Sequence, residues 1–305
     1  MKGTVMRSTG SWYEVLGEDQ QHYSCRIRGK FRLDESKESN PVAVGDYVVF
    51  ESEQTNHVIT EILDRKNHIL RQSVKKTGHT HVLAANIDQV LMLATLKQPR
   101  TSLGFIDRFF ATAESFRIPQ LLVFNKADLL NAEQEAEVNQ VLDIYRNIGV
   151  QTHLLSALHD EEVTDLQKLL HHKTTLIAGH SGVGKSTLLN KLSPEIGQAV
   201  GKISNFSNKG THTTTFAEMF ALDHDTFIID TPGVKEWGLA DMSEQEISDY
   251  FPEFRDLRLS CKFGARCLHL HEPQCAVLKA REEGKVANSR YESYVSMVRG
   301  DDNRK

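Results

Sequence analysis

The middle of the chain contains the stretch Gly179-His180-Ser181-Gly182-Val183-Gly184-Lys185-Ser186-Thr187. It matches the pattern G-x-x-x-x-G-K-[ST], and it stands between a predicted strand at 174–178 and a predicted helix that begins near Ser186. Glycines in such a loop let backbone N–H groups surround phosphates, and the helix N-terminus adds the positive end of a dipole. We expect Lys185 to reach the outer phosphates and the Ser186 hydroxyl to bind Mg²⁺. A chance glycine-rich turn is the alternative, but the strand–loop–helix context favours a nucleotide site.

On both sides of this loop, from about residue 71 to 238, predicted strands alternate with predicted helices. Continuous apolar runs, typical of strands buried on both faces, lie at 89–95, 120–124, 150–155, 174–178 and 226–229. Helices are predicted at 105–116 and 132–148. This alternation predicts a doubly wound parallel α/β sheet.

A second motif follows the run at 120–124 and reads Asn125-Lys126-Ala127-Asp128. It resembles the N-K-x-D motif with which the translation-factor class of GTPases recognises guanine. The Asp128 carboxylate can accept from both the ring N–H and the exocyclic amine of guanine, a donor pair that adenine lacks. Taken alone, the four residues also fit a surface turn after a strand. Ser156-Ala157 resembles the short loop that supports the guanine in such proteins.

A third motif, Asp230-Thr231-Pro232-Gly233, closes the run at 226–229 and has the form D-x-x-G. In this fold class the aspartate positions Mg²⁺, usually through water, and the glycine N–H senses the γ-phosphate. A Pro-Gly turn without function is the alternative.

The segment between these phosphate motifs contains Gly210-Thr211-His212-Thr213-Thr214-Thr215. Its composition suits a switch loop in which one threonine hydroxyl completes the Mg²⁺ shell, Thr214 being our first choice and Thr213 our second. A plain polar loop is the alternative. Val234 stands after D-x-x-G, where Ras-like proteins use Gln to orient water. Valine neither donates nor accepts, so His212 is the candidate for this role.

The order of the motifs is unusual, because N-K-x-D and the Ser-Ala pair precede the phosphate-binding loop. Ordinary GTPases have the reverse order. The same sheet is retained if the chain is opened elsewhere, because the termini of a domain often lie close together. The sequence therefore predicts a circularly permuted GTPase domain.

The first 70 residues differ from this pattern. Short β-prone runs at 4–6, 12–15, 23–28, 47–50 and 57–60 are separated by turn residues, as expected of a small OB-type barrel. Basic side chains alternate in one of these runs and would share one face of a strand: Arg26, Arg28, Lys30 and Arg32. Such a stripe can follow a phosphate backbone, although a solvated strand face has the same composition.

Beyond residue 238 the chain is predicted to be mostly helical, with one helix at 275–283. Three of the four cysteines cluster there in the pattern Cys261-x5-Cys267-x-His269-x5-Cys275. Three thiolates and one imidazole suit one tetrahedral Zn²⁺, and a closed set of four ligands indicates a structural metal. His271 is an alternative ligand, and three unrelated buried cysteines are the alternative interpretation.

Composition sets broad limits. The chain has 305 residues, a net charge of −5 and 39% hydrophobic residues, so a nucleic-acid surface would have to be local. The N-terminus shows no signal peptide, and apolar runs such as 90–96 are too short to cross a bilayer. We expect a cytoplasmic protein that has no membrane partner and is a monomer.

Taken together, these motifs resemble the ribosome small-subunit-dependent GTPase A (RsgA) family over essentially the whole chain. The resemblance implies an OB-fold RNA-binding domain at 1–70, a permuted GTPase domain at 71–238 and a zinc domain at 239–305. It implies GTP hydrolysis to GDP in late maturation of the 30S subunit, with that particle and its 16S rRNA as partners and with stimulation by the particle. It also implies that His212 is catalytic and that His269, rather than His271, binds zinc. The residue before His212, often Arg in the family, is Thr211 here.

Two other functions remain open at this point. A GTPase switch could act on a protein or membrane partner through the barrel. A module that holds GTP without hydrolysing it would be consistent with Val234.

Overall fold

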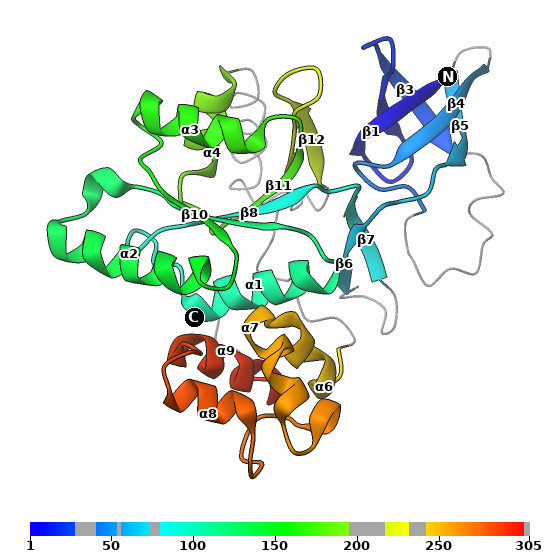
Figure 1. Ribbon diagram of the computed structural model, residues 1–305. Coiled ribbons are helices and arrows are strands. Elements are labelled where there is room, and N and C mark those ends of the chain that lie inside the picture. The colour runs from blue at the N-terminus through cyan, green and yellow to red at the C-terminus, as the bar shows by residue number, and fades with distance from the viewer. Residues whose placement is uncertain (28–40, 54–55, 73–79, 195–216, 232–241, 302–305) are drawn as a thin grey trace. The chain divides into compact units, whose positions relative to one another are not determined.

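The computed structural model describes residues 1–27, 41–53, 56–72, 80–194, 217–231 and 242–301 (Figure 1). The chain forms two compact units. Unit 1 comprises Met1–Leu91, Ser156–Gly179 and Gly184–Glu236. Unit 2 comprises Met92–Leu155, His180–Val183 and Trp237–Lys305.

Unit 1 begins with a closed barrel of five strands, as the sequence predicts. These are β1 (Lys2–Ser8), β2 (Tyr13–Gly17), β3 (His22–Ile27), β4 (Tyr47–Glu53) and β5 (Asn56–Ile62). Their order is β1-β2-β3-β5-β4, and β4 pairs back onto β1, which closes the barrel. Alternate side chains such as Val15, Phe50 and Ile59 are fully buried inside it. The fold is therefore the expected OB-like barrel.

A two-stranded antiparallel ribbon follows the barrel and is absent from the sequence-based prediction. It consists of β6 (His68–Gln72) and β7 (Thr80–Ala85). Ala84 forms an isolated bridge with Val44, in the turn that leads into β4. Asp46, in the same turn, is held by Arg65 at 2.7 Å between Nε and Oδ1.

The rest of unit 1 contains strands β11 (Thr174–Ala178), β12 (Glu218–Ala221) and β13 (Phe227–Asp230), with helices α3 (Asp160–Leu170) and α4 (Lys185–Leu192). β11 and β13 are parallel, as predicted, and Ile177 lies opposite Asp230. β12 departs from the predicted parallel sheet because it pairs antiparallel with β13. Only residues 222–226 connect the two strands, and so short a connection permits only an antiparallel pair.

Unit 2 contains the end of β8 (Gln89–Ala94), followed by β9 (Gln120–Phe124) and β10 (Gln151–Leu154). β9 lies between β8 and β10, and its pairing with β10 is parallel. Helices α1 (Leu103–Ser115) and α2 (Ala132–Arg146) begin at side-chain caps, Ser102 and Asn131. These elements match the predicted ones to within a few residues.

The C-terminal part of unit 2 is mostly helical, as expected. It contains α6 (Glu244–Ile247), α7 (Pro252–Arg255), α8 (Ala276–Glu282) and α9 (Asn288–Val298), with short 3-10 turns between them. Phe251, Phe254 and Tyr294 form an aromatic cluster in its core. Among the residues that the structure describes, no helix has both the length and the apolar character needed to cross a membrane.

Buried ion pairs join this helical region to α1 and α2. The Arg290 side chain, on α9, is 3% exposed and donates to Asp107 Oδ1 of α1 at 2.6 Å and to Glu253 Oε1 of α7 at 2.8 Å. The Tyr145 hydroxyl, from α2, donates to the same Asp107 oxygen at 2.7 Å. Burial disfavours the guanidinium charge, but attraction to Glu253 and Asp107 outweighs it and raises the pKa of Arg290 above its ordinary value.

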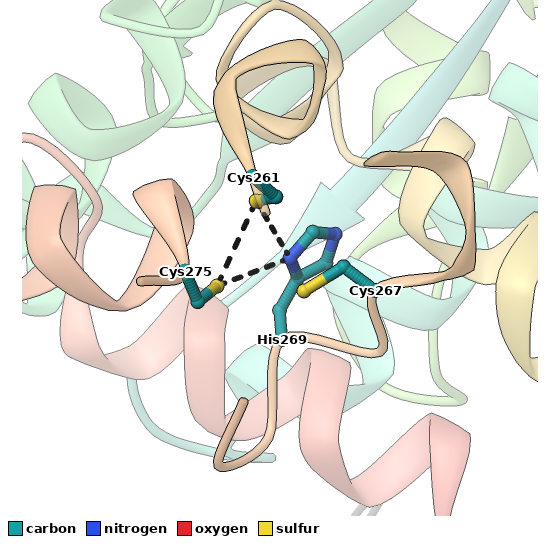
Figure 2. A group of neighbouring side chains, drawn as sticks. All are labelled: Cys261, Cys267, His269 and Cys275. Atoms are coloured by element: carbon teal, nitrogen blue, oxygen red, sulfur yellow. Dashed lines mark hydrogen bonds between the residues drawn. The ribbon is translucent and has the colours of Figure 1, made fainter. Parts of the chain in front are cut away.

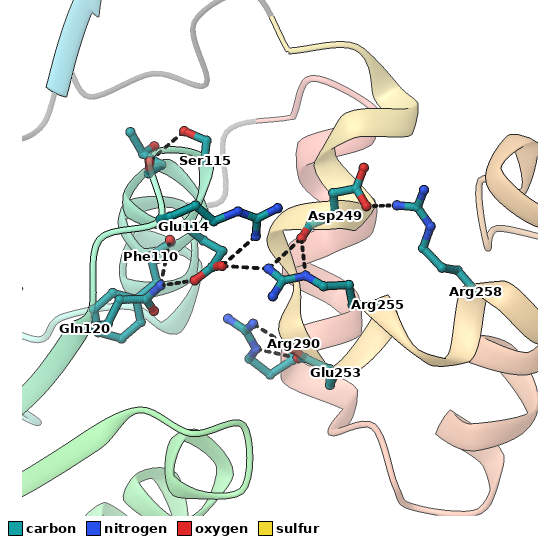
Figure 3. Close-up of polar contacts among 11 residues, drawn as sticks. Phe110, Glu114, Ser115, Gln120, Asp249, Glu253, Arg255, Arg258 and Arg290 are labelled. Atoms are coloured by element: carbon teal, nitrogen blue, oxygen red, sulfur yellow. Dashed lines mark hydrogen bonds and ion pairs between the residues drawn. The ribbon is translucent and has the colours of Figure 1, made fainter. Parts of the chain in front are cut away.

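A second contact lies beside the first (Figure 3). Arg255 donates from Nη2 to Glu114 Oε1 of α1 at 2.6 Å and to the Asp249 carbonyl at 2.9 Å. Gln120 also donates to Glu114, at its other oxygen. Helix α1 therefore meets the C-terminal helices through charged side chains whose hydrogen bonds fix the geometry.

We predict that Arg290→Met lowers the free energy of unfolding of unit 2 by about 3–5 kcal/mol, because Asp107 and Glu253 would be left buried without a counter-charge. Arg146→Met, which removes the exposed ion pair with Asp143, is the matched control and should cost less than about 0.5 kcal/mol. Urea unfolding followed by circular dichroism measures both. Equal midpoints for the two variants would contradict the prediction.

Candidate functional site

The phosphate-binding motif forms a strand–loop–helix, as the sequence predicts. β11 ends at Ala178, and α4 begins at Lys185. Gly182 and Gly184 adopt φ angles of 86° and 99°, which only glycine adopts without a steric cost. Ser186 and Thr187 are exposed in the first turn of α4. The loop therefore has the backbone that phosphate binding at a helix N-terminus requires.

Unit 1 brings two of the predicted phosphate-site residues together. Lys185 Nζ lies 3.4 Å from Asp230 Oδ1, and each side chain is about one-fifth exposed. Because β11 and β13 are parallel neighbours, the P-loop lysine and the D-x-x-G aspartate both follow carboxyl ends of strands and lie at the same edge of the sheet. The next residue, Thr231, is buried, and its hydroxyl has no hydrogen-bond partner among the described atoms.

Unit 2 brings the first residue of the base-reading motif to the P-loop. Asn125 is 4% exposed, and its Nδ2 donates to the Val183 carbonyl at 2.8 Å. Lys126 follows in the left-handed region, at φ 66°, and its ammonium donates to the Gln98 carbonyl. Asp128, two residues later, is exposed. A non-glycine residue with positive φ at such a position is typical of a functional site held by its surroundings.

An aromatic contact in unit 2 was not predicted from the sequence. The His180 ring, in the P-loop, stacks on Phe105 of α1 with centroids 4.0 Å apart and an interplanar angle of 29°. Gly182 lies close to Pro99, so that a Cβ at this glycine would meet the proline ring at 3.4 Å. No spacing rule links these residues, which lie far apart in the chain.

The Ser-Ala pair lies in unit 1. Ser156 and Ala157 are buried, and Ser156 accepts hydrogen bonds from Leu158 N at its hydroxyl and from His159 N at its carbonyl. This is a tight turn between β10 and α3. The predicted switch residues His212, Thr213 and Thr214, and Gly233 with Val234, lie outside the described residues.

The predicted metal cluster is formed in unit 2 (Figure 2). Ligand atoms of Cys261, Cys267, His269 and Cys275 all lie within 4.8 Å of one another, and all four residues are buried. His269 Nδ1 lies 3.7 Å from Cys261 Sγ and 3.3 Å from Cys275 Sγ, and the two sulfurs are 3.9 Å apart. The alternative ligand, His271, is exposed and stands outside the cluster.

These distances fit zinc. A tetrahedral ion at about 2.3 Å from sulfur and about 2.0 Å from nitrogen separates two sulfurs by about 3.8 Å and sulfur from nitrogen by about 3.5 Å. Burial lowers the pKa of His269 to about 4, which keeps the ring neutral and able to ligate. Burial raises the pKa of Cys267 to about 12, so a nearby cation is needed to stabilise its thiolate. The cluster can therefore hold one zinc ion.

Neighbouring side chains hold the loop between the ligands. Glu272 accepts from the backbone N–H groups of Leu268, Leu270 and His271. Partial burial disfavours the Glu272 carboxylate, but these hydrogen bonds outweigh it and lower its pKa. The Tyr291 hydroxyl, from α9, donates to the His269 carbonyl at 2.8 Å. A lone acidic residue inside the cysteine pattern is a signal that could have indicated Glu272.

Comparison with known proteins agrees with this geometry. The family model described as RsgA GTPase matches residues 62–240, and the model of the RsgA N-terminal domain matches residues 2–59. This chain belongs to the RsgA family of GTPases. The permuted order of motifs and the barrel are therefore family features.

Named relatives and solved structures cover almost the whole chain. A small ribosomal subunit biogenesis GTPase RsgA from Christiangramia forsetii is 46% identical, over 99% of this chain and 97% of its own. RsgA 2 from Bacteroides thetaiotaomicron is also 46% identical, over 98% and 96%. The crystal structure of YjeQ from Thermotoga maritima superposes with a TM-score of 0.80 at 32% identity, over 100% of this chain and 99% of that one. YloQ, described as a circularly permuted GTPase, gives 0.75 at 29%, over 100% and 96%.

We predict that the purified protein carries about one zinc ion and that Cys267→Ser loses it, because a serine hydroxyl is a poor zinc ligand. Cys25→Ser is the matched control, since Cys25 is buried in the barrel and is the only cysteine outside the cluster. Elemental analysis by mass spectrometry measures both. A full equivalent of zinc in the Cys267 variant would disprove the assignment.

Proposed function

We propose that this RsgA-family GTPase acts in late maturation of the small ribosomal subunit, in the cytoplasm, where it binds the 30S particle and its 16S rRNA. The observation that carries the proposal is identity of 46% over nearly the full length with proteins named for small-subunit biogenesis. The P-loop and its Lys185–Asp230 pair support the GTPase activity on which that role depends.

The guanine base is bound by the N-K-x-D motif in this proposal. Asp128 accepts from the ring N–H and the exocyclic amine, which makes the site selective for guanine over adenine. Asn125 binds the nucleotide with this motif and also holds the P-loop, because its side-chain N–H donates to the Val183 carbonyl. Ser156 and Ala157 support the base from their tight turn.

The phosphates are bound by the P-loop backbone and by Lys185. Mg²⁺ is expected on oxygen ligands, which this site offers as the Ser186 hydroxyl, the Asp230 carboxylate through water, and the Thr214 or Thr213 hydroxyl. When bound, the ion neutralises charge on the phosphates. Lys185, partly withdrawn from water, contributes a fixed positive charge beside them.

The attacking water is oriented by His212 in this proposal. Val234 cannot do so, because its side chain has no polar atom. The imidazole can accept a proton or donate a hydrogen bond near neutral pH. Because Val234 cannot orient the attacking water, GTP hydrolysis by the protein alone should be slow, and it should accelerate on the 30S particle.

The barrel offers a surface suited to RNA. Arg26 stacks over the Trp12 ring at 4.0 Å. Beside this pair lies a hollow of about 330 Å³, lined among others by Arg7, His22 and Tyr23. Half-buried aromatic rings beside exposed basic groups on an OB sheet face favour stacking with bases and contact with phosphates. Arg28, Lys30 and Arg32 of the predicted stripe lie outside the described residues.

We assign the barrel to residues 1–70, the GTPase domain to 71–238 and the zinc domain to 239–305.

We predict that Asp128→Asn weakens GTP binding by about tenfold to a hundredfold, because the amide keeps one acceptor oxygen but sets an N–H donor against one of the two guanine donors. The variant should gain affinity for xanthosine triphosphate, whose base carries a carbonyl where guanine has its amine. Asp143→Asn, at an exposed position on α2, is the matched control. Competition against a fluorescent guanine nucleotide measures both, and unchanged preference would refute the base-reading role.

We predict that GTP turnover rises with added 30S subunits until it saturates, and that His212→Ala removes most of the rise without weakening GTP binding. His224→Ala, an exposed histidine between β12 and β13, should behave as the wild type. Single-turnover hydrolysis against titrated 30S measures this. A rate of GTP hydrolysis that does not change with added 30S subunits would overturn the proposed function. A fully active His212 variant would overturn only the role of His212.

A further inference from the structure

Unit 1 contains a second group of metal-ligating side chains, distinct from the residues of the P-loop motif and from the cysteine cluster. His171 and His172 follow α3 and immediately precede β11. Asp225 lies in the turn that joins β12 to β13. One ligand atom from each of the three residues lies within 4.8 Å of the others, and all three residues are exposed.

The backbone under this group is fixed by hydrogen bonds. Asp223 Oδ1 accepts from Asp225 N at 3.0 Å and from Thr226 N at 2.8 Å, which closes the turn. The Thr226 hydroxyl accepts from His172 N at 3.1 Å and so ties the end of α3 to the same turn. His172 has a φ of 56°, an uncommon conformation that these contacts hold. The side chains therefore project from defined positions on two different segments.

The side chains already form a polar cluster. The two imidazole rings stack with centroids 3.8 Å apart and an interplanar angle of 21°. His172 Nδ1 lies 2.5 Å from Asp225 Oδ2. His171 Nδ1 lies 3.7 Å from Asp223 Oδ2, which adds a second carboxylate at the edge of the group. Two imidazoles with two carboxylates are ligands typical of Zn²⁺, Ni²⁺, Co²⁺ and Cu²⁺.

We propose that His171, His172 and Asp225 form a binding site for a divalent transition-metal ion, separate from the zinc cluster and from the nucleotide Mg²⁺. The ion replaces the hydrogen bond between His172 Nδ1 and the Asp225 carboxylate, and water completes its coordination shell. An ion about 2.1 Å from each donor holds the donors about 3–3.4 Å apart. His172 Nδ1 and Asp225 Oδ2, now 2.5 Å apart, therefore separate slightly on binding, while the more distant donors move closer.

Because of its position, this site can link two segments of unit 1. It lies at the amino ends of β11 and β13, whereas Gly179 and Asp230 stand at the carboxyl ends of the same strands. An ion bound there cross-links the end of α3 to the β12–β13 turn. Because it binds the folded arrangement and not the unfolded chain, it raises the melting temperature of the protein as its concentration increases.

The test uses untagged full-length protein that retains its structural zinc, without nucleotide, titrated with Ni²⁺ in a calorimeter. Wild type is expected to bind one ion per chain in a saturable manner, with a matching rise in melting temperature. His171→Gln, His172→Asn and Asp225→Asn should each weaken binding at least about tenfold. Asparagine is chosen at 172 because it tolerates positive φ.

His22→Asn is the matched control, because His22 pairs with Glu14 at 2.8 Å in the barrel but belongs to no group of three metal-ligating side chains among the described residues. It should bind Ni²⁺ as the wild type does. The proposal is overturned if wild type takes up no ion, or if the three site variants bind as tightly as wild type. Three separate variants keep the test valid if one of them fails to fold.

Discussion

The buried charge of Arg290 constrains four helices of unit 2. A guanidinium withdrawn from water is stable only with charged partners at hydrogen-bond distance. Asp107 and Glu253 meet that demand from α1 and α7, and Tyr145 completes the contact from α2. Four helices must therefore occupy one relative arrangement. Apolar packing alone would tolerate sliding between them, whereas these directional bonds do not.

The zinc cluster depends on this arrangement and extends it. Tyr291 and Tyr294 lie on α9, the helix that Arg290 fixes, and they donate to the carbonyls of His269 and Leu268 beside the ligands. The loop that carries His269 is thus held by α9 from one side and by Glu272 from within. The ligand cysteines and the two tyrosines of α9 belong to the same hydrophobic core.

Much of this architecture could be predicted from the sequence, because the deciding signals are local. The P-loop requires glycines at fixed positions, and buried parallel strands are continuous apolar runs. The cysteine pattern with one histidine indicates a metal by composition. The structure brings His269 and not His271 into the cluster. Residue types and spacing alone left that choice open, and it was the family resemblance that favoured His269.

What could not be predicted depends on partners distant in the chain. Asp107 stands inside an apolar helix and gives no hint that Arg290, 183 positions later, compensates it. The antiparallel β12 is only four residues long and carries too little pattern to be recognised. The contact between Phe105 and His180 follows from tertiary packing alone.

The contacts of Arg255 and Arg290 with α1 limit how segments of such a protein can be exchanged between relatives. The zinc region cannot be exchanged between relatives as an independent module. The incoming region must carry side chains that pair with Glu114 and Asp107 of the recipient's α1, as Arg255 and Arg290 do here. Inheritance of this region and of helix α1 is therefore linked, although 141 positions separate Glu114 from Arg255 in the chain.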